Sequence, residues 1–371
     1  MASIARRDDG RWRARYRDPA GREHARHFPR KVDAQRWIDG VTTAVQTGTY
    51  VDPGRSRVTV GAWSARWLAA QGQLKPSTRA RYEGILRVQV MPTWGTVALS
   101  DVTHADIASW VSSLDLAPAT VRQAHRVLSL VLRLAVRDGR IARNPADRVP
   151  LPRAAKPDKR FLTHAEVDAL AEAAGDHALA IRVLAYCGLR FGELAALRVR
   201  RVDLLRRRIE IAEAVTEVGG RAVFGTPKTH QRRSVPLRRS LVDALGEQMA
   251  GKAPDDYVFP ADKGGVIRLR NWRRQVFDPA ARAAGLPCVT PLDLRHTAAS
   301  LAVSAGANVK AVQRLLGHAS AAMTLDVYAG LFDDDLDALA DRLDEGSARA
   351  LADSLRTSEA VVDFGERRAS R

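Results

Sequence analysis

The chain has 371 residues, 46% of them hydrophobic, which is enough to bury the cores of two or three domains and excludes a disordered chain. Its 59 Lys and Arg residues against 42 Asp and Glu give a formal charge of +17, which favours a polyanionic partner, most commonly nucleic acid. An anionic membrane surface is the competing explanation, but no apolar run approaches the roughly 20 residues of a membrane span. We therefore expect no membrane partner.

The cysteine content and the first residues of the chain predict a cytoplasmic protein. Cys187 and Cys288 cannot by themselves form a disulfide framework or a cysteine-based zinc site. The N-terminus lacks the apolar core of a signal peptide, so a reducing, intracellular location is expected. No cluster of carboxylates, cysteines and histidines asks for a metal, and we expect neither a metal nor another cofactor.

Residues 1–55 are predicted to form a small basic sheet backed by one helix. The expected elements are a strand over residues 10–17, a turn at 18–21, a strand over 23–28 and a helix over 32–47. The helix is expected to bury one side, made of Val32, Trp37, Val41 and Val45. Arginines occupy one face of the first strand, at Arg11, Arg13, Arg15 and Arg17. This face fits either a solvated strand surface or a sheet that lies in a DNA groove.

Residues 59–150, after a linker at 52–57, are predicted to form an all-helical bundle. Helix starts are expected at Pro76, Thr103 and Pro118, because proline suits the first helical turn and threonine suits the N-cap. The helix from Pro118 carries a long apolar stripe and is expected to stop at Asp138-Gly139. Polar and basic residues near these starts are candidates for phosphate contacts. They are Lys75, Thr78, Arg81, Thr120, Arg122 and Arg126.

Residues 158–350, after a Pro-rich basic linker at 150–157, are predicted to form a mainly helical domain with a small sheet. Strands are expected near 208–211, 215–218 and 233–237. A helix that begins at residues 333–335 would carry a narrow apolar stripe of Leu336, Leu339 and Leu343. Residues 351–371 are expected to form a polar C-terminal tail. The predicted fold class is therefore α+β and multidomain.

Several charged or polar residues of this third region stand in apolar surroundings. Arg190 follows the apolar end of a helix, and Glu193 lies one turn on, so a buried Arg–Glu pair would explain both. The others are Arg295 and His296 within Leu292–Thr297, His318 after a Leu-Leu-Gly run, and Tyr328 at the end of Thr324–Tyr328. Each residue taken singly predicts little.

The order of these residues carries more information than any one of them. The segments are Tyr186–Leu194, Thr226–Thr229, Asp293–Thr297, Leu315–His318 and Thr324–Tyr328. With these residues in this order and in these contexts, the chain resembles the tyrosine recombinase/phage integrase family. It is similar in particular to the integrases of actinobacteria and their phages. The resemblance implies an arm-site DNA-binding domain over 1–55, a core-binding domain over 59–150 and a catalytic domain over 158–350.

The resemblance also implies the role of each site residue. Arg190 and Arg295 would grip the scissile phosphate, since arginine can do so with two hydrogen bonds. Tyr328 would be the nucleophile that forms a 3′-phosphotyrosine. Lys228 would protonate the leaving 5′-oxygen, and His318 would hydrogen-bond the phosphate. Glu193 would hold the Arg190 side chain in position without contacting the phosphate itself.

One position departs from the family pattern. The second arginine normally stands in a His-x-x-Arg motif, but the first position here is Leu292. His296 is not expected to substitute, because related proteins often carry a histidine there as well. We expect a slower but active enzyme, because the loss of one positioned donor costs about 2.7–4 kcal/mol of barrier in other enzymes. The alternative is a chain that has lost activity and only binds DNA.

The implied function is site-specific integration and excision of a phage or mobile element. The implied partners are double-stranded DNA with core-type and arm-type sites, a homotetramer on that DNA, a host DNA-bending protein and an excision factor. Two other classes stay open. A non-enzymatic regulator could use 298–304 and 308–316 as a helix-turn-helix, and a type IB topoisomerase would share the phosphotyrosine. The basic N-terminal sheet argues against the topoisomerase, and against a chromosome-dimer resolvase, which normally lacks such a domain.

Overall fold

The computed structural model describes residues 2–19, 21–154, 159–227, 232–331, 340–341 and 343–352. The chain divides into two compact units, Met1–Pro157 and Asp158–Arg371. Two separate hydrophobic cores lie in the first unit, one in the N-terminal sheet and one in the helical region. Among the described residues, no helix combines the length and apolarity that crossing a bilayer requires.

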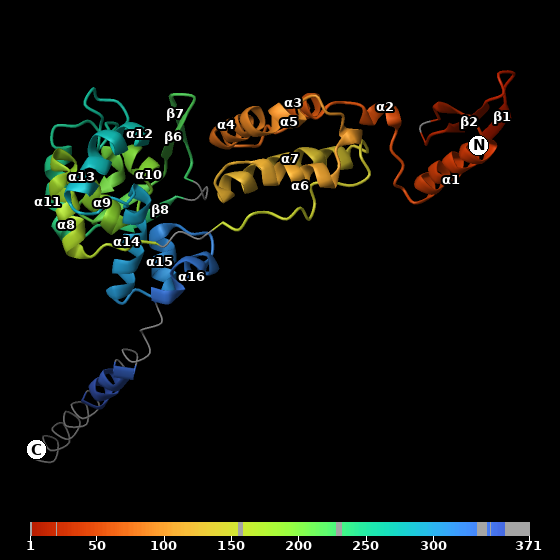
Figure 1. The fold of residues 1–371 in the computed structure, drawn as a ribbon. Helices are drawn as coiled ribbons and strands as arrows, with labels where there is room; N and C mark the ends of the chain where they lie inside the picture. The colour runs from red at the N-terminus through yellow and green to blue at the C-terminus, as the bar shows by residue number, and fades with distance from the viewer. Residues whose placement is uncertain are drawn as a thin grey trace, which may run out of the picture. The chain divides into compact units, whose positions relative to one another are not determined.

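The N-terminal part is a three-stranded antiparallel sheet with one helix packed on it (Figure 1). Its elements are β1 (Ser3–Arg6), β2 (Trp12–Arg17), β3 (Glu23–Phe28) and α1 (Lys31–Gln46). The two predicted strands and the helix are confirmed, whereas β1 was not foreseen. The predicted buried side of α1 is wrong in part: Val32 and Val45 are 49% and 39% exposed. Ala34 and Ile38, one turn apart, face the sheet instead, because small Ala34 allows close approach to Ala14.

The second part of this unit is the predicted helical bundle. Its elements are α2 (Pro53–Ser56), α3 (Val60–Ala69), α4 (Pro76–Ile85), η1 (Leu86–Val90), α5 (Met91–Trp94), η2 (Leu99–Asp101), α6 (His104–Ser113) and α7 (Pro118–Arg137). The expected starts of α4, α6 and α7 are confirmed, and the Thr103 side chain caps α6 by accepting from the Asp106 amide. The predicted linker at 52–57 contains a helical turn, since the Asp52 carboxylate accepts from the Gly54 amide and caps α2.

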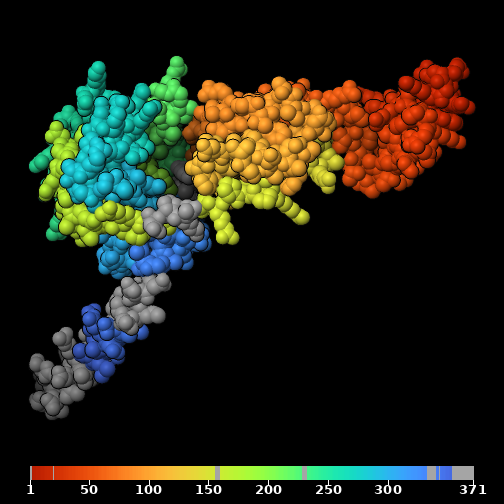
Figure 2. All heavy atoms as spheres, viewed as in Figure 1, coloured from red at the N-terminus to blue at the C-terminus, as the bar shows by residue number. Residues whose placement is uncertain are grey.

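The bundle, drawn in orange to yellow in the space-filling view of Figure 2, has a core of tryptophans and aliphatic side chains. Trp63 and Trp67 of α3 are each 4% exposed and pack against the stripe of α7, where Leu128 and Leu132 are fully buried. The indole Nε1 of Trp63 donates to the carbonyl of Val131 at 3.1 Å. Trp63 thus satisfies its one donor inside the apolar core.

The second unit surrounds short sheets with helices. Its helical elements are α8 (His164–Ala173), η3 (Gly175–His177), α9 (Ala178–Cys187), α10 (Phe191–Ala195), η4 (Val199–Arg201), η5 (Arg239–Leu241), α11 (Val242–Met249), α12 (Leu269–Trp272), η6 (Arg273–Phe277), α13 (Asp278–Ala283), α14 (Pro291–Ser304), α15 (Val309–Leu316), α16 (Ala321–Tyr328) and η7 (Ala329–Leu331). Helices α14, α15 and α16 lie together at one side of the unit (Figure 1).

The strands of the second unit form two sheets rather than one set. They are β4 (Val202–Asp203), β5 (Arg208–Ile211), β6 (Ala214–Val218), β7 (Arg221–Gly225) and β8 (Arg233–Pro236). One sheet has the order β4-β5-β8, and β6-β7 is a separate hairpin. The three predicted strands are confirmed within a residue, whereas β4 and β7 were not foreseen. The start of the helix predicted to begin at residues 333–335, with Leu336 and Leu339, lies outside the described residues. Residues 343–352 are helical, but Leu343, the third residue of the predicted apolar stripe, is 64% exposed.

Candidate active site

Arg190 stands where α9 gives way to α10. Helix α9 ends at Cys187 and is followed by Gly188, whose φ is +64°. A Cβ on Gly188 would lie 2.9 Å from Leu316 Cδ2, so both the backbone conformation and the space require glycine. Arg190 then precedes the first turn of α10. Its backbone N–H and its Nη1 each donate to the Glu193 carboxylate at 2.9 Å. The Arg190 side chain is 27% exposed, so a phosphate can reach it.

Glu193 is a buried carboxylate held by a second arginine. The Arg233 guanidinium donates to it twice, from Nη1 at 2.9 Å and from Nη2 at 2.6 Å. Arg233 Nε also donates to the Leu315 carbonyl at 3.2 Å, which ties β8 to the end of α15. Burial alone would raise the pKa of Glu193. The hydrogen bonds and charge of Arg233, together with Arg190, outweigh burial and hold this pKa below its ordinary value. Glu193 is therefore a carboxylate at neutral pH.

The sequence did not single out Arg233 as a site residue. One signal was present, because Arg233 and Val235 of β8 and Leu237 just after it stand at alternate positions. Val235 and Leu237 are fully or almost fully buried, and the Arg233 side chain is 8% exposed. An arginine on the buried face of a strand needs a buried partner. Glu193 is one carboxylate that the motifs place in apolar surroundings, and it is the one that Arg233 contacts.

Arg295 lies in the interior, on α14. It is 4% exposed, and its guanidinium donates to the carbonyls of Gly188 and Leu316, at the ends of α9 and α15. Helix C-termini carry partial negative charge and suit a cation there. Burial and the neighbouring charge of Arg190 lower the pKa of Arg295 to about 9, so the group stays protonated at neutral pH.

His318 follows the second left-handed glycine of the site. Gly317 has φ +64°, and a Cβ there would lie 2.7 Å from Arg233 Cδ. The His318 ring is oriented by a 3.0 Å hydrogen bond between Nδ1 and the hydroxyl of buried Thr324. Burial and the charges of the surrounding arginines lower the pKa of His318 to about 4. The imidazole is therefore neutral at pH 7.

Tyr328, the last residue of α16, is 2% exposed. Its ring stacks with His318, with centroids 6.4 Å apart and planes at 10°, and it also contacts Phe161. The Tyr328 hydroxyl lies 2.7 Å from Nδ1 of His296. Burial raises the pKa of Tyr328 to about 12, although the charges of Arg295 and Arg190 act in the opposite direction. His296 was not among the predicted site residues.

Five of the six predicted site residues thus converge: Arg190, Glu193, Arg295, His318 and Tyr328. Lys228 lies outside the described residues, between the end of β7 and the start of β8. Leu292, which replaces the usual histidine, is 58% exposed on the first turn of α14. It takes no part in the buried hydrogen-bond network.

The arginines of the N-terminal sheet share a face as predicted. Arg13, Arg15 and Arg17 surround the Glu23 carboxylate at N–O distances of 3.8, 3.6 and 4.0 Å, and Arg11 is exposed just before β2. In the bundle, the candidates lie at or near the starts of two helices and are exposed or half-buried. They are Lys75, Thr78 and Arg81 at α4 and Thr120, Arg122 and Arg126 at α7.

One group of residues in the described part of the chain has the spacing of metal ligands. Donor atoms of Asp18, His24 and Asp52 lie within 4.8 Å of one another. Protein hydrogen bonds already occupy them, since His24 Nε2 lies 2.9 Å from Asp18, and Asp52 caps α2. These residues belong to the first unit and not to the unit that holds Tyr328, so they add nothing to its chemistry.

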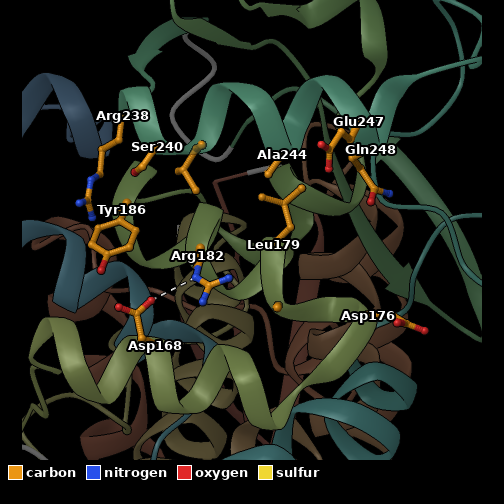
Figure 3. Close-up of a pocket in the computed structure, with 12 residues that line it drawn as sticks. Asp168, Asp176, Leu179, Arg182, Tyr186, Arg238, Ser240, Ala244, Glu247 and Gln248 are labelled. Carbon is orange, nitrogen blue, oxygen red and sulfur yellow. Dashed lines mark hydrogen bonds and ion pairs between the residues drawn. The ribbon is translucent and has the colours of Figure 1, made fainter.

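A hollow of about 670 Å³ lies between α8, α9 and α11 (Figure 3). Arg182 bridges to Asp168 at its wall, and Tyr186, Arg238 and Gln248 also line it. None of the converging site residues lines this hollow. The buried network around Tyr328 is therefore a separate feature of the unit.

Comparisons with known proteins agree with this arrangement. The model of the phage integrase family matches residues 160–334, the phage integrase N-terminal domain matches 3–47, and the phage integrase central domain matches 60–150. The integrase of Mycobacterium phage L5 is 27% identical over 343 residues, which cover 87% of this chain and 92% of that protein. The chain belongs to the phage integrase family and is a tyrosine site-specific recombinase.

Solved structures show the same fold. The Tn1549 transposon integrase in complex with transposon right end DNA aligns with a TM-score of 0.68 and 24% identity, over 77% of this chain and 99% of that one. The lambda integrase tetramer bound to a Holliday junction aligns with a TM-score of 0.57 and 20% identity, over 87% and 94%. At identities of 24% and 20%, these comparisons show the fold alone.

The Glu193 network generates a prediction about stability. The substitution Glu193→Gln removes the buried counter-charge of Arg233 and should lower the free energy of unfolding by about 3–5 kcal/mol in urea denaturation at pH 7. A carboxyl whose pKa falls on folding contributes fully to the free energy of unfolding at any pH above its ordinary pKa, 4.5. That contribution is lost as the pH drops below this value. The difference between wild type and variant should therefore shrink in acid.

The matched control is Asp168→Asn, which breaks an ion pair with Arg182 where Asp168 is 51% exposed. Its cost should not exceed about 1 kcal/mol. Equal losses for the two variants, or a difference that does not change with pH, would contradict the role assigned to Glu193.

Proposed function

We propose that this recombinase cuts and rejoins attachment-site DNA through a 3′-phosphotyrosine at Tyr328, and so integrates and excises a phage or mobile element. The observation that supports it best is the position of the Tyr328 hydroxyl. It lies beside two histidines and close enough to Arg190 and Arg295 for both charges to act on the phenol.

In this mechanism the protein stabilises charge that develops on the scissile phosphate. Arg190 and Arg295 would bind its non-bridging oxygens, and such positioned cations count most where water is excluded. His318, held through Nδ1 by Thr324, would present Nε2 to the same phosphate. Lys228 would protonate the leaving 5′-oxygen. The energy of the broken bond stays in the phosphotyrosine, so rejoining needs no nucleotide.

The remaining parts of the chain would bind the DNA around the cut. We assign arm-site binding to residues 1–55, core-site binding to 59–150 and chemistry to 158–350, with 351–371 as a tail. A homotetramer on DNA is proposed because the lambda integrase, which shares the fold, forms one on a Holliday junction. The protein would act on DNA in the cytoplasm of its bacterial host, with a host DNA-bending protein and an excision factor as accessory partners.

The same chemistry could resolve chromosome dimers. Integration is favoured because the match to the phage L5 integrase runs over most of both chains and the integrase N-terminal domain matches residues 3–47. The decisive assay is recombination between the candidate attachment sites that flank the gene. Efficient recombination of those sites is expected, and DNA binding without recombination would favour a binding-only protein.

The nucleophile can be tested by trapping. On a nicked suicide substrate, the wild-type protein should form a covalent adduct that resists denaturation, and Tyr328→Phe should form none while it binds the DNA with unchanged affinity. Adduct of equal yield from Tyr328→Phe would assign the nucleophile to another residue.

The departure from the family pattern at Leu292 generates a prediction about rate. Because this side chain is 58% exposed, a histidine should be accommodated without repacking. We expect Leu292→His to accelerate cleavage by up to about 100-fold to 1000-fold, since one positioned donor is worth about 2.7–4 kcal/mol. Leu292→Gln, which is similar in length but cannot take up a proton, serves as control. Adduct from Leu292→His alone, with none from wild type, would show that the natural chain is not competent.

The arginine face of β2 can be tested by salt dependence. Replacing Arg13 and Arg15 with alanine should weaken binding to arm-type DNA and reduce the slope of log K against log salt by about 0.9 for each lost phosphate contact. Binding to core-type DNA should not change. Glu23→Gln should have the opposite effect, because the Glu23 carboxylate competes for the same arginines. Unchanged arm binding in the double variant would leave this face a solvated surface.

A further inference from the structure

We propose that His296 is the general base of this recombinase, accepting the phenolic proton of Tyr328 through Nδ1 as the tyrosine attacks the scissile phosphate. The inference rests on the proposed function. It assigns a step that Arg190, Arg295, His318 and Lys228 leave open, namely where the proton of the nucleophile goes. Its starting point is the 2.7 Å separation between His296 Nδ1 and Tyr328 Oη.

The geometry suits a proton transfer. The rings are tilted by 59° with centroids 5.7 Å apart, so the hydroxyl meets the edge of the imidazole rather than its face. A candidate base must lie within about 2.6–3.2 Å of the atom it deprotonates, and His296 does. His318 is arranged differently, since its ring lies parallel to that of Tyr328 and its Nδ1 is bonded to Thr324.

The position of His296 on α14 gives it a place beside the phosphate-binding arginine. It directly follows Arg295 and lies four residues after Leu292, so Leu292 and His296 share a face of the helix. Leucine cannot accept a proton, and in this chain the histidine of that face stands one turn further along. The helix thus carries a cation for the phosphate and a base for the nucleophile on adjacent residues.

The surroundings keep His296 able to accept a proton at neutral pH. Burial lowers the pKa of its imidazole. Asp293 on the same helix acts in the opposite direction, while Arg295 and Lys159, the latter from the segment before α8, add to the lowering. Tyr328 and His318 face it from α16 and from the turn after α15. A neutral ring with its proton on Nε2 presents the Nδ1 lone pair to the phenol.

The nucleophile needs such a base because its own acidity is low. With a pKa of about 12, only about 10⁻⁵ of Tyr328 is phenolate at pH 7, since 7 − 12 = −5. In the proposed step the Oη–H bond breaks, the proton moves to Nδ1 and the oxygen pair forms the new O–P bond. The bond between phosphorus and the 5′-oxygen breaks, and that oxygen takes a proton from the general acid, assigned above to Lys228. Rejoining reverses each transfer.

The test is the single-turnover rate of adduct formation on a nicked suicide substrate between pH 5 and 9, with the full-length protein. His296→Gln should be slower by about 100-fold to 10,000-fold at pH 7, the usual contribution of a general base. The loss should diminish as pH rises, because hydroxide then replaces the base. His296→Ala should regain rate when imidazole is added. The control His164→Gln removes another His–Tyr hydrogen bond, of 3.1 Å to Tyr186, and should leave the profile unchanged.

A second substrate separates the base from the acid. A 5′-bridging phosphorothiolate leaves as a thiolate and needs no acid, so it should restore Lys228→Ala but not His296→Gln. If this substrate restored the rate of adduct formation by His296→Gln, the histidine would be the acid for the leaving group. If His296→Gln formed adduct as fast as wild type or faster on the ordinary substrate, the hydrogen bond to Tyr328 would have no part in the reaction. Either result overturns the inference while wild type still forms adduct. Absence of adduct from wild type would overturn the proposed function itself.

Discussion

The site depends on the ion pairs that the buried carboxylate of Glu193 forms. Two arginines from distant segments, Arg190 and Arg233, donate to its oxygens. Arg233 also holds the Leu315 carbonyl, and Gly317 packs directly against it. One ion network therefore sets the position of the arginine after α9 and of the turn that presents His318. Removing a buried charge leaves its partner uncompensated, so these positions are strongly fixed.

Burial serves the chemistry as well as the fold. Arg295 and Tyr328 are 4% and 2% exposed, and the histidines beside them are driven toward the neutral state. Cations that are fixed in a dry site stabilise developing phosphate charge more than they would in water. The same burial makes Tyr328 a weaker acid. A site of this kind therefore needs a proton acceptor at the hydroxyl, and His296 is in place for it.

The sequence predicted the elements well where its signals are local. The starts of α4, α6 and α7 follow from a proline or threonine and are confirmed. The order of motifs identified the residues that converge around Tyr328, although their roles stay predictions. Contacts between distant segments could not be predicted from the sequence. Nothing local says that Arg233 reaches Glu193 or that His296 reaches Tyr328, and the buried side of α1 was misjudged because packing on the sheet favours small Ala34 over Val32.

The most direct measurement is mass spectrometry of the trapped covalent complex after digestion with nuclease and trypsin. If Tyr328 is the nucleophile, we expect a nucleotide attached through its 3′-phosphate to the peptide that contains Tyr328, and a free 5′-hydroxyl on the released strand. A nucleotide on any other residue, or a complex that never becomes covalent on cleavable DNA, would contradict it.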